Sequence, residues 1–576
     1  MGLLNSALQI GRSALLSYQG ALQVVGNNIS SAASPDYTRL TPGLDPLQGN
    51  ELTRGLQPGA GVSLTDIQRN LDEALESRLR LSISGEQGQL VQRSVLSQVE
   101  AFFDDASGAG IGERLRTFLG GFDGLQNAPE DRATRDSVLS NGTLLAGSLH
   151  TLRTQLTDLG RQTDTQIGEL VPTINELVRN IADLNERITR AEAGGTGIAT
   201  GLRDQRDASL RGLSEFLDIS AFEQHNGAIN LYVGSEALAQ GSVYRELIAV
   251  TDHDGPFART SVRFADTNAN VAVRGGTLAG LLESRDVHAY GRVADLDRLA
   301  VALIEEVNRV HADGLGLVGL ESVDGTYDLL ATDVPLNSPE AGLAFTPQSG
   351  SFFITVQDDA THTPIAYQLN VTFDDPAQAT TLESLVADIN DQVNGVTAVI
   401  TADRRLTITA DDGYSFTFGH DGQLARTDTS HVLAALGVNT FFAGRDASDI
   451  AVRAALAENP LLIAAASTPH AGDGVNAGRI AALDTTRVAA LDGVSFPGFY
   501  NSVVGDVAVS AAATNEQSEA AETIRLSLQA EKESISGVSL DEEAIALLKY
   551  ERAFQGTSRF ISVVDGLLRE LVSLLR

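Results

Sequence analysis

Apolar residues recur along the start of the chain in alternating steps of four and three. The positions are 4, 8, 11, 15, 18, 22, 25 and 29, and all of them except Gly11 are apolar. This spacing is typical of a helix that packs along a partner helix in a coiled coil. The stripe, here called the N-terminal seam, consists of Leu4, Leu8, Leu15, Tyr18, Leu22, Val25 and Ile29.

The end of the chain repeats this pattern. Positions 547, 550, 554, 557, 561, 564, 568, 571 and 575 step by three and four, and only Thr557 among them is polar. Ser539 and Glu542 have the spacing of a capping box at the start of this helix. The C-terminal seam consists of Leu547, Tyr550, Phe554, Ile561, Val564, Leu568, Leu571 and Leu575. We therefore expect the two terminal helices to pair as a coiled coil.

Each terminal helix also carries apolar residues outside its seam, for example Leu16 and Phe560. A helix that is apolar on more than one side requires more than one neighbour. Two arrangements would satisfy this requirement: a hairpin buried in the core of its own chain, or coverage by neighbouring subunits. We favour the second arrangement and expect the two seams to belong to an assembly interface.

Between the ends, the periodicity changes from helix to strand and back. Helical stretches are predicted at 90–103, 144–159, 167–193, 296–310 and 511–533, within a region that we expect to be largely helical from residue 64 to 225. Short alternating strands are predicted within 218–275 and again from about residue 325, where one helix, 381–393, interrupts them.

These patterns predict a multidomain α+β fold with paired terminal helices, an elongated helical-bundle body and an inserted β-rich outer domain. The terminal layer would comprise residues 1–40 and 537–576. The body would comprise 41–324 and 475–536, with a small β insertion near 218–275. The β-rich outer domain would comprise 325–474.

The charge is strongly negative and unevenly distributed. The net charge is −34, yet residues 1–40 hold only Arg12, Asp36 and Arg39, and residues 537–576 hold six acids and five bases. Almost all of the negative charge therefore lies between the two ends. Such a chain is repelled by nucleic acid and by anionic membrane surfaces. No apolar run reaches the ~18–20 residues that span a bilayer.

Motifs that would support enzymatic or metal chemistry lack the context they need. The chain has no Cys, which excludes disulfides and thiolate metal sites. Gly314, Gly316 and Gly319 form a literal G-x-G-x-x-G, but it follows a predicted helix rather than a strand. The Asp266–Asn270 stretch begins like a calcium loop but lacks that loop's Gly and final Glu. We expect no enzyme, no cofactor and no metal site.

Motifs at both ends resemble the family of flagellar axial proteins, which build the rod, the hook and the hook–filament junction. The N-terminal stretch from Asn27 to Arg39 resembles the family's N-N-I-A-N-x-x-T-P-G-Y-x-R, and the stretch from Ser536 to Glu543 resembles S-G-V-N-L-D-E-E. An internal L-R-D-Q-R-D segment at 202–207 points within this family to a junction protein. The matching residues are Asn27, Asn28, Ile29, Pro35, Tyr37, Asp204, Gln205, Arg206, Asp207, Gly537, Val538, Leu540, Asp541, Glu542 and Glu543.

One departure from the family pattern bears on geometry. Asp36 stands where the family motif has Gly. A Gly at that position suggests a backbone with positive φ, which Asp tolerates better than most residues. We therefore expect the turn to be kept.

The resemblance implies a structural adapter that joins the hook to the filament and assembles through its terminal helices after export. It implies a homo-oligomeric ring, contacts with the hook protein and the second hook–filament junction protein, and a cytoplasmic export chaperone on the C-terminal helix. It also implies an extracellular location, reached without a cleaved signal peptide, with no nucleic-acid partner and no membrane insertion. Two alternatives stay open: another axial protein, such as the hook or second junction protein, and a secreted adhesin that uses the β-rich region.

Overall fold

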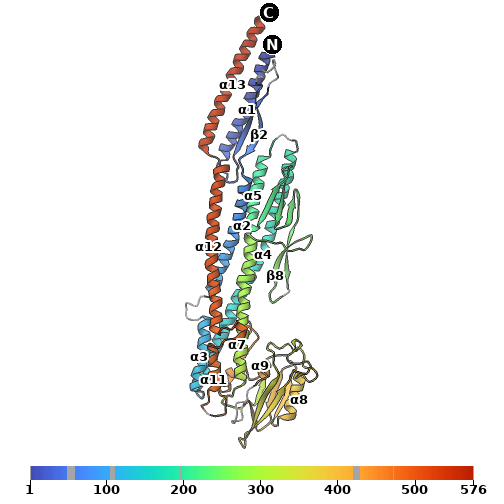
Figure 1. The fold of residues 1–576 in the computed structure, drawn as a ribbon, viewed down its shortest axis with the longest axis vertical. Helices are drawn as coiled ribbons and strands as arrows, with labels where there is room; N and C mark the ends of the chain where they lie inside the picture. Colours follow the sequence, from blue (N-terminus) through green and yellow to red (C-terminus); the bar gives the residue numbers. More distant parts are fainter. Residues whose placement is uncertain are drawn as a thin grey trace. The chain divides into compact units, whose positions relative to one another are not determined.

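The computed structural model describes residues 2–48, 59–103, 110–194, 197–253, 255–419, 428–470 and 472–574. The chain divides into two compact units. Figure 1 shows its helices and strands. Unit 1 comprises Met1–Ser94, Gln162–Ser284 and Ala512–Arg576, and unit 2 comprises Val95–Arg161 and Arg285–Ala511. Three long helices contribute residues to both units: α2 (Glu73–Phe102), α4 (Arg132–Glu192) and α12 (Phe496–Ser536).

Unit 1 combines the terminal helices with a small β region. Its other elements are α1 (Gly2–Ser31), β1 (Leu40–Leu47), β2 (Gly61–Arg69), α5 (Thr200–Phe216), β3 (Ile219–Glu223), β4 (Ile229–Val233), β5 (Glu236–Gln240), β6 (Val243–Tyr244), β7 (Leu247–Asp252), β8 (Arg259–Phe264), α6 (Gly276–Glu283) and α13 (Leu540–Leu574). Strands β3 to β6 form one antiparallel sheet, and β7 pairs with β8.

The main apolar core of unit 1 lies between α4, α5 and the strands. Ile174, Ile181 and Leu213 from the helices pack with Leu231 and Phe264 from the strands. A smaller core joins α2 to α12 through Leu75, Leu79 and Leu528. Asp72 begins α2 by accepting hydrogen bonds from the backbone N–H groups of Ala74 and Leu75, at 2.9 and 3.0 Å, as an N-cap does.

Unit 2 contains the second β region. Its elements are α3 (Ile111–Asn127), α7 (Tyr290–Ala312), β9 (Ser322–Asp324), η2 (Pro339–Ala341), β10 (Gly350–Asp358), β11 (Pro364–Val371), α8 (Leu382–Gln392), β12 (Val396–Ile400), β13 (Leu406–Ala410), β14 (Tyr414–Phe418), α9 (Val432–Ala435), β15 (Phe442–Ala443), β16 (Ala451–Val452), α10 (Ala454–Glu458), η3 (Pro460–Leu462), α11 (Val475–Ala481), η4 (Ala482–Asp484) and η5 (Ala489–Leu491). A π-helical turn, η1 (Ser284–Ala289), connects α6 to α7.

Two three-stranded sheets and α8 enclose the core of the β region in unit 2. The strand orders are β11-β10-β14 and β12-β13-β9. Phe352 and Ile354 of β10 pack in one cluster with Leu385 of α8 and Ile408 of β13. Alternate residues of β10 and β13 are buried, as expected for strands with one face on a core.

The fold class predicted from the sequence is confirmed: the chain is multidomain α+β, with long terminal helices that pair and several β-sheets. The observed helices are longer than the predicted ones. For example, the predicted stretches 144–159 and 167–193 belong to the single helix α4. The region 64–225 is largely helical, as predicted. Its helices begin only at Glu73, because residues 64–69 belong to strand β2 and pair with β1.

The G-x-G-x-x-G stretch and the stretch that begins like a calcium loop both have structural roles in the described chain. The G-x-G-x-x-G stretch follows the end of α7, and a Cβ at Gly316 would lie 2.7 Å from the carbonyl oxygen of Leu461. Asp266 lies just after β8 and pairs with Arg245 at 2.7 Å. Among the described residues, no group of three or more His, Asp or Glu side chains is placed to hold a metal ion.

Candidate assembly interface

The terminal helices α1 and α13 lie side by side and run antiparallel (Figure 1). Gly11, early in α1, contacts Ile561 late in α13, whereas Asn28 near the end of α1 contacts Glu543 in the first turn of α13. A Cβ at Gly11 would lie 2.5 Å from Cγ1 of Ile561. Gly11 is thus the one non-apolar seam position in α1 because the two helices approach each other closely there.

The predicted seam residues lie on the facing sides of these helices to different degrees. Val25 and Val564 are buried, and Ile29 and Leu547 are exposed at 36% and 37%. Leu575 lies outside the described residues. The remaining seam residues are partly buried: Leu4, Leu8, Leu15, Tyr18 and Leu22 in α1, and Tyr550, Phe554, Ile561, Leu568 and Leu571 in α13.

A two-stranded ribbon, β1 and β2, covers a second side of α1 (Figure 1). Ala21 and Val24, which lie off the seam, are buried. A Cβ at Gly20 would lie 2.6 Å from the side chain of Leu64, and the hydroxyl of Ser17 donates a 3.0 Å hydrogen bond to the carbonyl of Val62. The sequence did not reveal this ribbon. We call α1, β1, β2 and α13 together the terminal module.

Asn28 links the end of α1 to β1 and α13. Its side chain is 1% exposed and uses all of its hydrogen-bonding groups. The amide nitrogen donates to the carbonyl of Leu40 at 2.8 Å and to Glu543 at 3.0 Å. The amide oxygen accepts from the N–H of Leu40 at 3.0 Å and from the hydroxyl of Tyr37 at 2.8 Å. Asn27, next to it, is exposed.

Arg39 joins the N-terminal motif to the C-terminal one. Its guanidinium donates to the buried Glu543 at 2.8 Å and to Glu542 at 2.6 Å, and its backbone N–H donates to the carbonyl of Ser536 at 2.9 Å. Half of the predicted capping box is formed, because the hydroxyl of Ser539 accepts from the N–H of Glu542 at 3.5 Å. The carboxylate of Glu542 pairs with Arg39.

Burial in this cluster raises the pKa of Tyr37. Partial burial of the phenol, together with the nearby carboxylates of Asp204 and Glu543, raises the pKa of Tyr37 to about 12. Both effects disfavour the negative phenolate. Tyr37 therefore stays protonated, which it must do to donate its hydrogen bond to Asn28.

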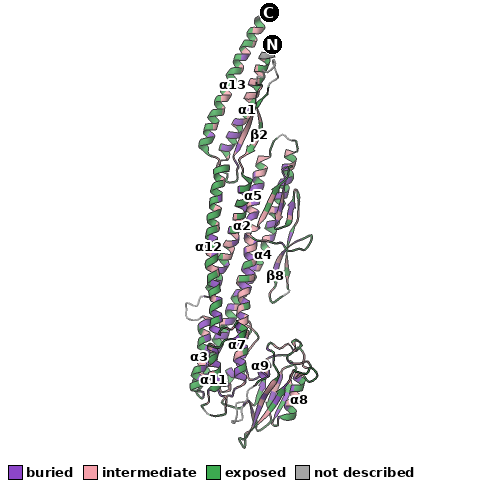
Figure 2. Cartoon of the chain, in the orientation of Figure 1, coloured by how far each residue is buried: buried purple, intermediate pink, exposed green. Residues whose placement is uncertain are grey.

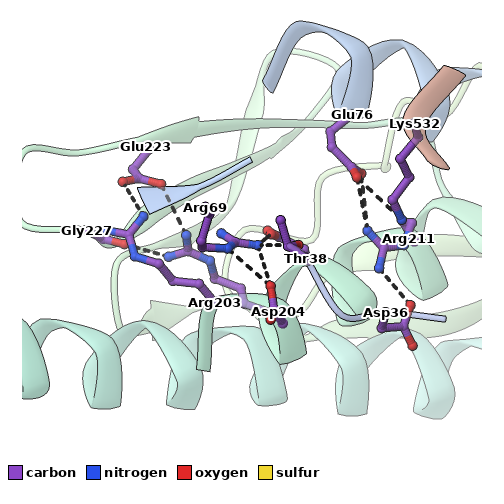
Figure 3. A network of polar contacts seen from close by, with 12 residues as sticks. Asp36, Thr38, Arg69, Glu76, Arg203, Asp204, Arg211, Glu223, Gly227 and Lys532 are labelled. Carbon is purple, nitrogen blue, oxygen red and sulfur yellow. Dashed lines mark hydrogen bonds and ion pairs between the residues drawn. The ribbon is translucent and has the colours of Figure 1, made fainter. Parts of the chain in front are cut away.

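The internal motif residues Asp204 and Asp207 lie on one side of α5 and bind Arg69, the last residue of β2 (Figure 3). Nε and Nη2 of Arg69 donate to Asp204 at 3.1 and 2.8 Å, and Nη2 also pairs with Asp207. The Arg69 side chain is 8% exposed. Burial raises the pKa of Asp204, and the charge of Arg69 opposes that rise.

Arg206, another motif residue, supports the β3–β4 turn. It donates to the carbonyl of Gly227 at 2.6 Å, to the side chain of Asn185 at 3.1 Å and to Glu223 at 3.2 Å. Burial lowers the pKa of Arg206, and the carboxylates around it offset part of that effect. Gln205 is exposed and lies apart from these contacts.

A second ionic cluster surrounds Arg211 of α5 (Figure 3). Arg211 pairs with Asp36 at 2.7 Å and with the buried Glu76 of α2 at 3.2 Å. Lys532 of α12 lies 3.6 Å from Glu76. The expectation of positive φ at position 36 is wrong, because Asp36 is not among the described residues with positive φ. Its carboxylate serves as an ion-pair partner instead.

The remaining motif residues are less enclosed. Pro35, Leu540 and Asp541 are exposed, and Val538 is partly buried. Gly537 follows the last residue of α12, and a Cβ there would lie 2.2 Å from the carbonyl oxygen of Glu533. Gly537 is therefore required sterically where α12 ends and α13 is about to begin.

Much of α13 is exposed (Figure 2), and several of its exposed residues are large and apolar. The exposed apolar residues of α13 that lie off the C-terminal seam and share one side of the helix form what we call the outer face: Ile545, Leu548, Phe560, Val563 and Leu567. A helix face of this kind is a surface for protein association. None of the helices in the described part of the chain combines the length and apolar character needed to cross a bilayer.

Comparison with known proteins gives consistent matches. Residues 96–324 match the family described as "Flagellar hook-associated protein FlgK helical domain", and residues 532–574 match "Flagellar basal body rod FlgEFG protein C-terminal". Flagellar hook-associated protein 1 of Escherichia coli K12 is 27% identical over 99% of this chain and 100% of its own length. The protein of the same name from Bacillus subtilis 168 is 25% identical over 66% of this chain and 80% of its own length.

A solved structure shares the fold. The flagellar hook junction protein FlgK from Burkholderia pseudomallei superposes with a TM-score of 0.52 at 15% identity, over 80% of this chain and all of that one. With the paired terminal helices, these matches define the chain as a structural protein of the bacterial flagellum. Within that class, the chain is a full-length homologue of flagellar hook-associated protein 1.

Proposed function

We propose that this protein joins the hook to the filament as a ring of identical subunits, and that the outer face of α13 is the surface through which its terminal modules assemble. The observation that carries the proposal is the exposure of Ile545, Val563 and Leu567 on a helix whose other side is occupied by α1. Exposed apolar rows of this length on a soluble chain mark association sites.

The contacts within the terminal module support a division of roles between the two seams and the outer face. The seam residues join α1 to α13 inside one subunit, and the outer face then remains for a neighbour. The hook protein and the second hook–filament junction protein are the proposed partners above and below the ring. A cytoplasmic export chaperone would cover the same apolar helix before assembly, since an uncovered apolar face favours aggregation.

The proposal is structural and includes no catalytic step and no nucleic-acid partner. Its site is extracellular, at the hook–filament junction, after export from the cytoplasm. Residues 325–474 are proposed as the outer domain, and the separate apolar core around Phe352, Leu385 and Ile408 supports independent folding of that region. A second role as an adhesin has no specific observation in its favour.

Removal of residues 537–576 tests the proposal. This deletion removes α13 with its outer face and also Glu543, the partner of Asn28. The truncated chain should keep the melting transition of unit 2 and remain soluble. In a strain that lacks its own junction protein, it should reach the culture medium but should not restore filament growth. Restored filaments would show that α13 is dispensable for assembly.

A further inference from the structure

The terminal module is attached to the rest of unit 1 by short connections and by polar contacts. The chain passes between the two only at 70–72 and at 537–539. The two apolar cores described in unit 1 contain residues of α2, α4, α5, α6, α12 and the strands β3 to β8, and neither contains a residue of the terminal module. Hydrogen bonds and ion pairs between the described residues therefore contribute to the orientation of the terminal module on these helices.

One of these contacts is buried and compact. Arg69, at the end of β2, is held by Asp204 and Asp207 of α5, and the three side chains are 8%, 11% and 12% exposed. Breaking the two ion pairs of the buried Arg69 would leave charges without partners in a low-dielectric site. This contact therefore has the character of a fixed pivot beside the connection at 70–72.

The second contact is the ion pair between Asp36 and Arg211, and only its Asp36 partner is exposed. Arg211 also pairs with the buried Glu76 at 3.2 Å. Asp36 lies in the turn after α1 and is 56% exposed, and its carboxylate lies 2.7 Å from Arg211. The Arg211 side chain is only 14% exposed, so it is the solvent-exposed Asp36 end of the pair that water and salt weaken. The pair can therefore open without disturbing the pivot.

A groove lies beside this ion pair. It is a cavity of about 940 Å³, bounded by the turn at 31–37 on one side and by residues of α2, α5 and α12 on the other, including Ile83, Glu215 and Gln529. Both Asp36 and Arg211 line it. The groove gives the turn room to move when the Asp36–Arg211 pair opens.

We propose that Asp36 and Arg211 are positioning residues that latch the terminal module onto α5, so that the module turns about the Arg69 pivot when the latch opens. The use of this motion during ring assembly rests on the proposed function, whereas the latch itself is a property of the single subunit.

The absence of Cys in the chain makes a direct measurement possible. We would replace the exposed Ser527 of α12 and Ser562 of α13 by Cys, attach spin labels, and measure the distance distribution between them by pulsed EPR in the full-length monomer. Asp36→Asn removes the charge and keeps the shape. It should raise the population of displaced distances about two- to five-fold, the range expected for an ion pair with one solvent-exposed partner.

Two further variants separate a latch from a general structural effect. Asp36→Glu retains the charge and should keep the narrow distribution of the unmodified chain. Glu551→Gln removes one exposed charge from α13 away from the joint and should leave the distribution unchanged. In 1 M NaCl, where the Debye length is about 3 Å, the unmodified chain should approach the Asp36→Asn distribution. Indistinguishable distributions for the unmodified chain and Asp36→Asn at low salt would overturn the proposal, and so would a broad distribution in every variant. Neither outcome depends on ring assembly.

Discussion

Two neighbouring asparagines show how differently the same residue type is used within one turn of α1. Asn27 is exposed, whereas Asn28 is buried and binds Leu40, Tyr37 and Glu543. Asn suits this position because a carboxamide can donate and accept at once, which neither Asp nor Leu can do. The buried pair of Asn28 and Glu543 explains why the two terminal motifs, far apart in the sequence, belong to one structure.

Replacement of Asn28 by Ala should lower the free energy of unfolding of the terminal module by about 2–4 kcal/mol, because buried groups on Leu40 and Glu543 lose a partner. Asn27→Ala is the matched control and should change it by less than about 0.5 kcal/mol. Urea unfolding followed by circular dichroism measures both. Equal effects would mean that the hydrogen bonds of Asn28 contribute nothing specific.

Tyr37 provides a pH dependence at the alkaline end. Its pKa in the folded chain is about 12, above the value of ~10 for an unperturbed tyrosine. The folded state thus binds a proton that the unfolded state releases between these values, so stability is retained below pH 10 and falls as pH rises toward 12.

The Tyr37→Phe variant should lose the phenolate that appears near pH 12 in an absorbance titration at 295 nm, and it should show a weaker decline of melting temperature above pH 10. A loss of absorbance near pH 10 instead of pH 12 would show that Tyr37 ionises like an ordinary tyrosine.

At the scale of elements, the contact between α1 and α13 depends on close approach at Gly11. Gly11→Val should destabilise the terminal module by about 1–3 kcal/mol, the usual effect of overpacking, because its side chain would meet Ile561. Adding Ile561→Ala should restore much of the loss. Gly26→Ala is the control: a Cβ there meets nothing within 4 Å, and it should stabilise α1 by about 0.5–1 kcal/mol. Chemical unfolding compares all three, and a neutral Gly11→Val would exclude the close approach.

The helices could be predicted from the sequence because their periodicity is strong. Steps of three and four placed α1 and α13 and their facing sides, and the resemblance to axial proteins selected Asn28, Arg206 and Glu543. The ribbon of β1 and β2 could not be found in this way. Pro42, Gly43 and Pro46 make β1 read as a loop, and its stability comes from pairing with β2 and from contact with α1.

The ion-pair partners within the site were also beyond sequence reasoning. Asp36 looked like a substitute for Gly at a position of positive φ, yet its φ is not positive and its carboxylate binds Arg211, 175 residues away. Arg69 gave no signal in the sequence at all. Such pairings are set by tertiary packing, which periodicity and motif spacing do not report.

At the scale of the whole molecule, the large negative charge determines how we expect stability to depend on salt. The net charge is −34, and residues 325–474 hold 19 acidic residues and five Arg. Repulsion among like charges destabilises the compact state, and salt screens it. The melting temperature of unit 2 should therefore rise between 20 mM and 1 M NaCl. Neutralising the exposed Asp391, Asp403 and Asp412 to Asn should reduce this rise, as calorimetry would show. A melting temperature that falls with salt would mean that ion pairs outweigh the repulsion.

The most direct test of assembly through the outer face uses two adjacent residues of α13. Val563 is 62% exposed and Val564 is 4% exposed. Both Val→Asp variants would be introduced into a strain lacking the protein, with filament growth scored by electron microscopy and melting measured on the purified monomers. We predict that Val563→Asp changes the monomer's unfolding free energy by less than about 0.5 kcal/mol yet abolishes filaments, whereas Val564→Asp destabilises the terminal module itself. Normal filaments with Val563→Asp would contradict assembly through this face.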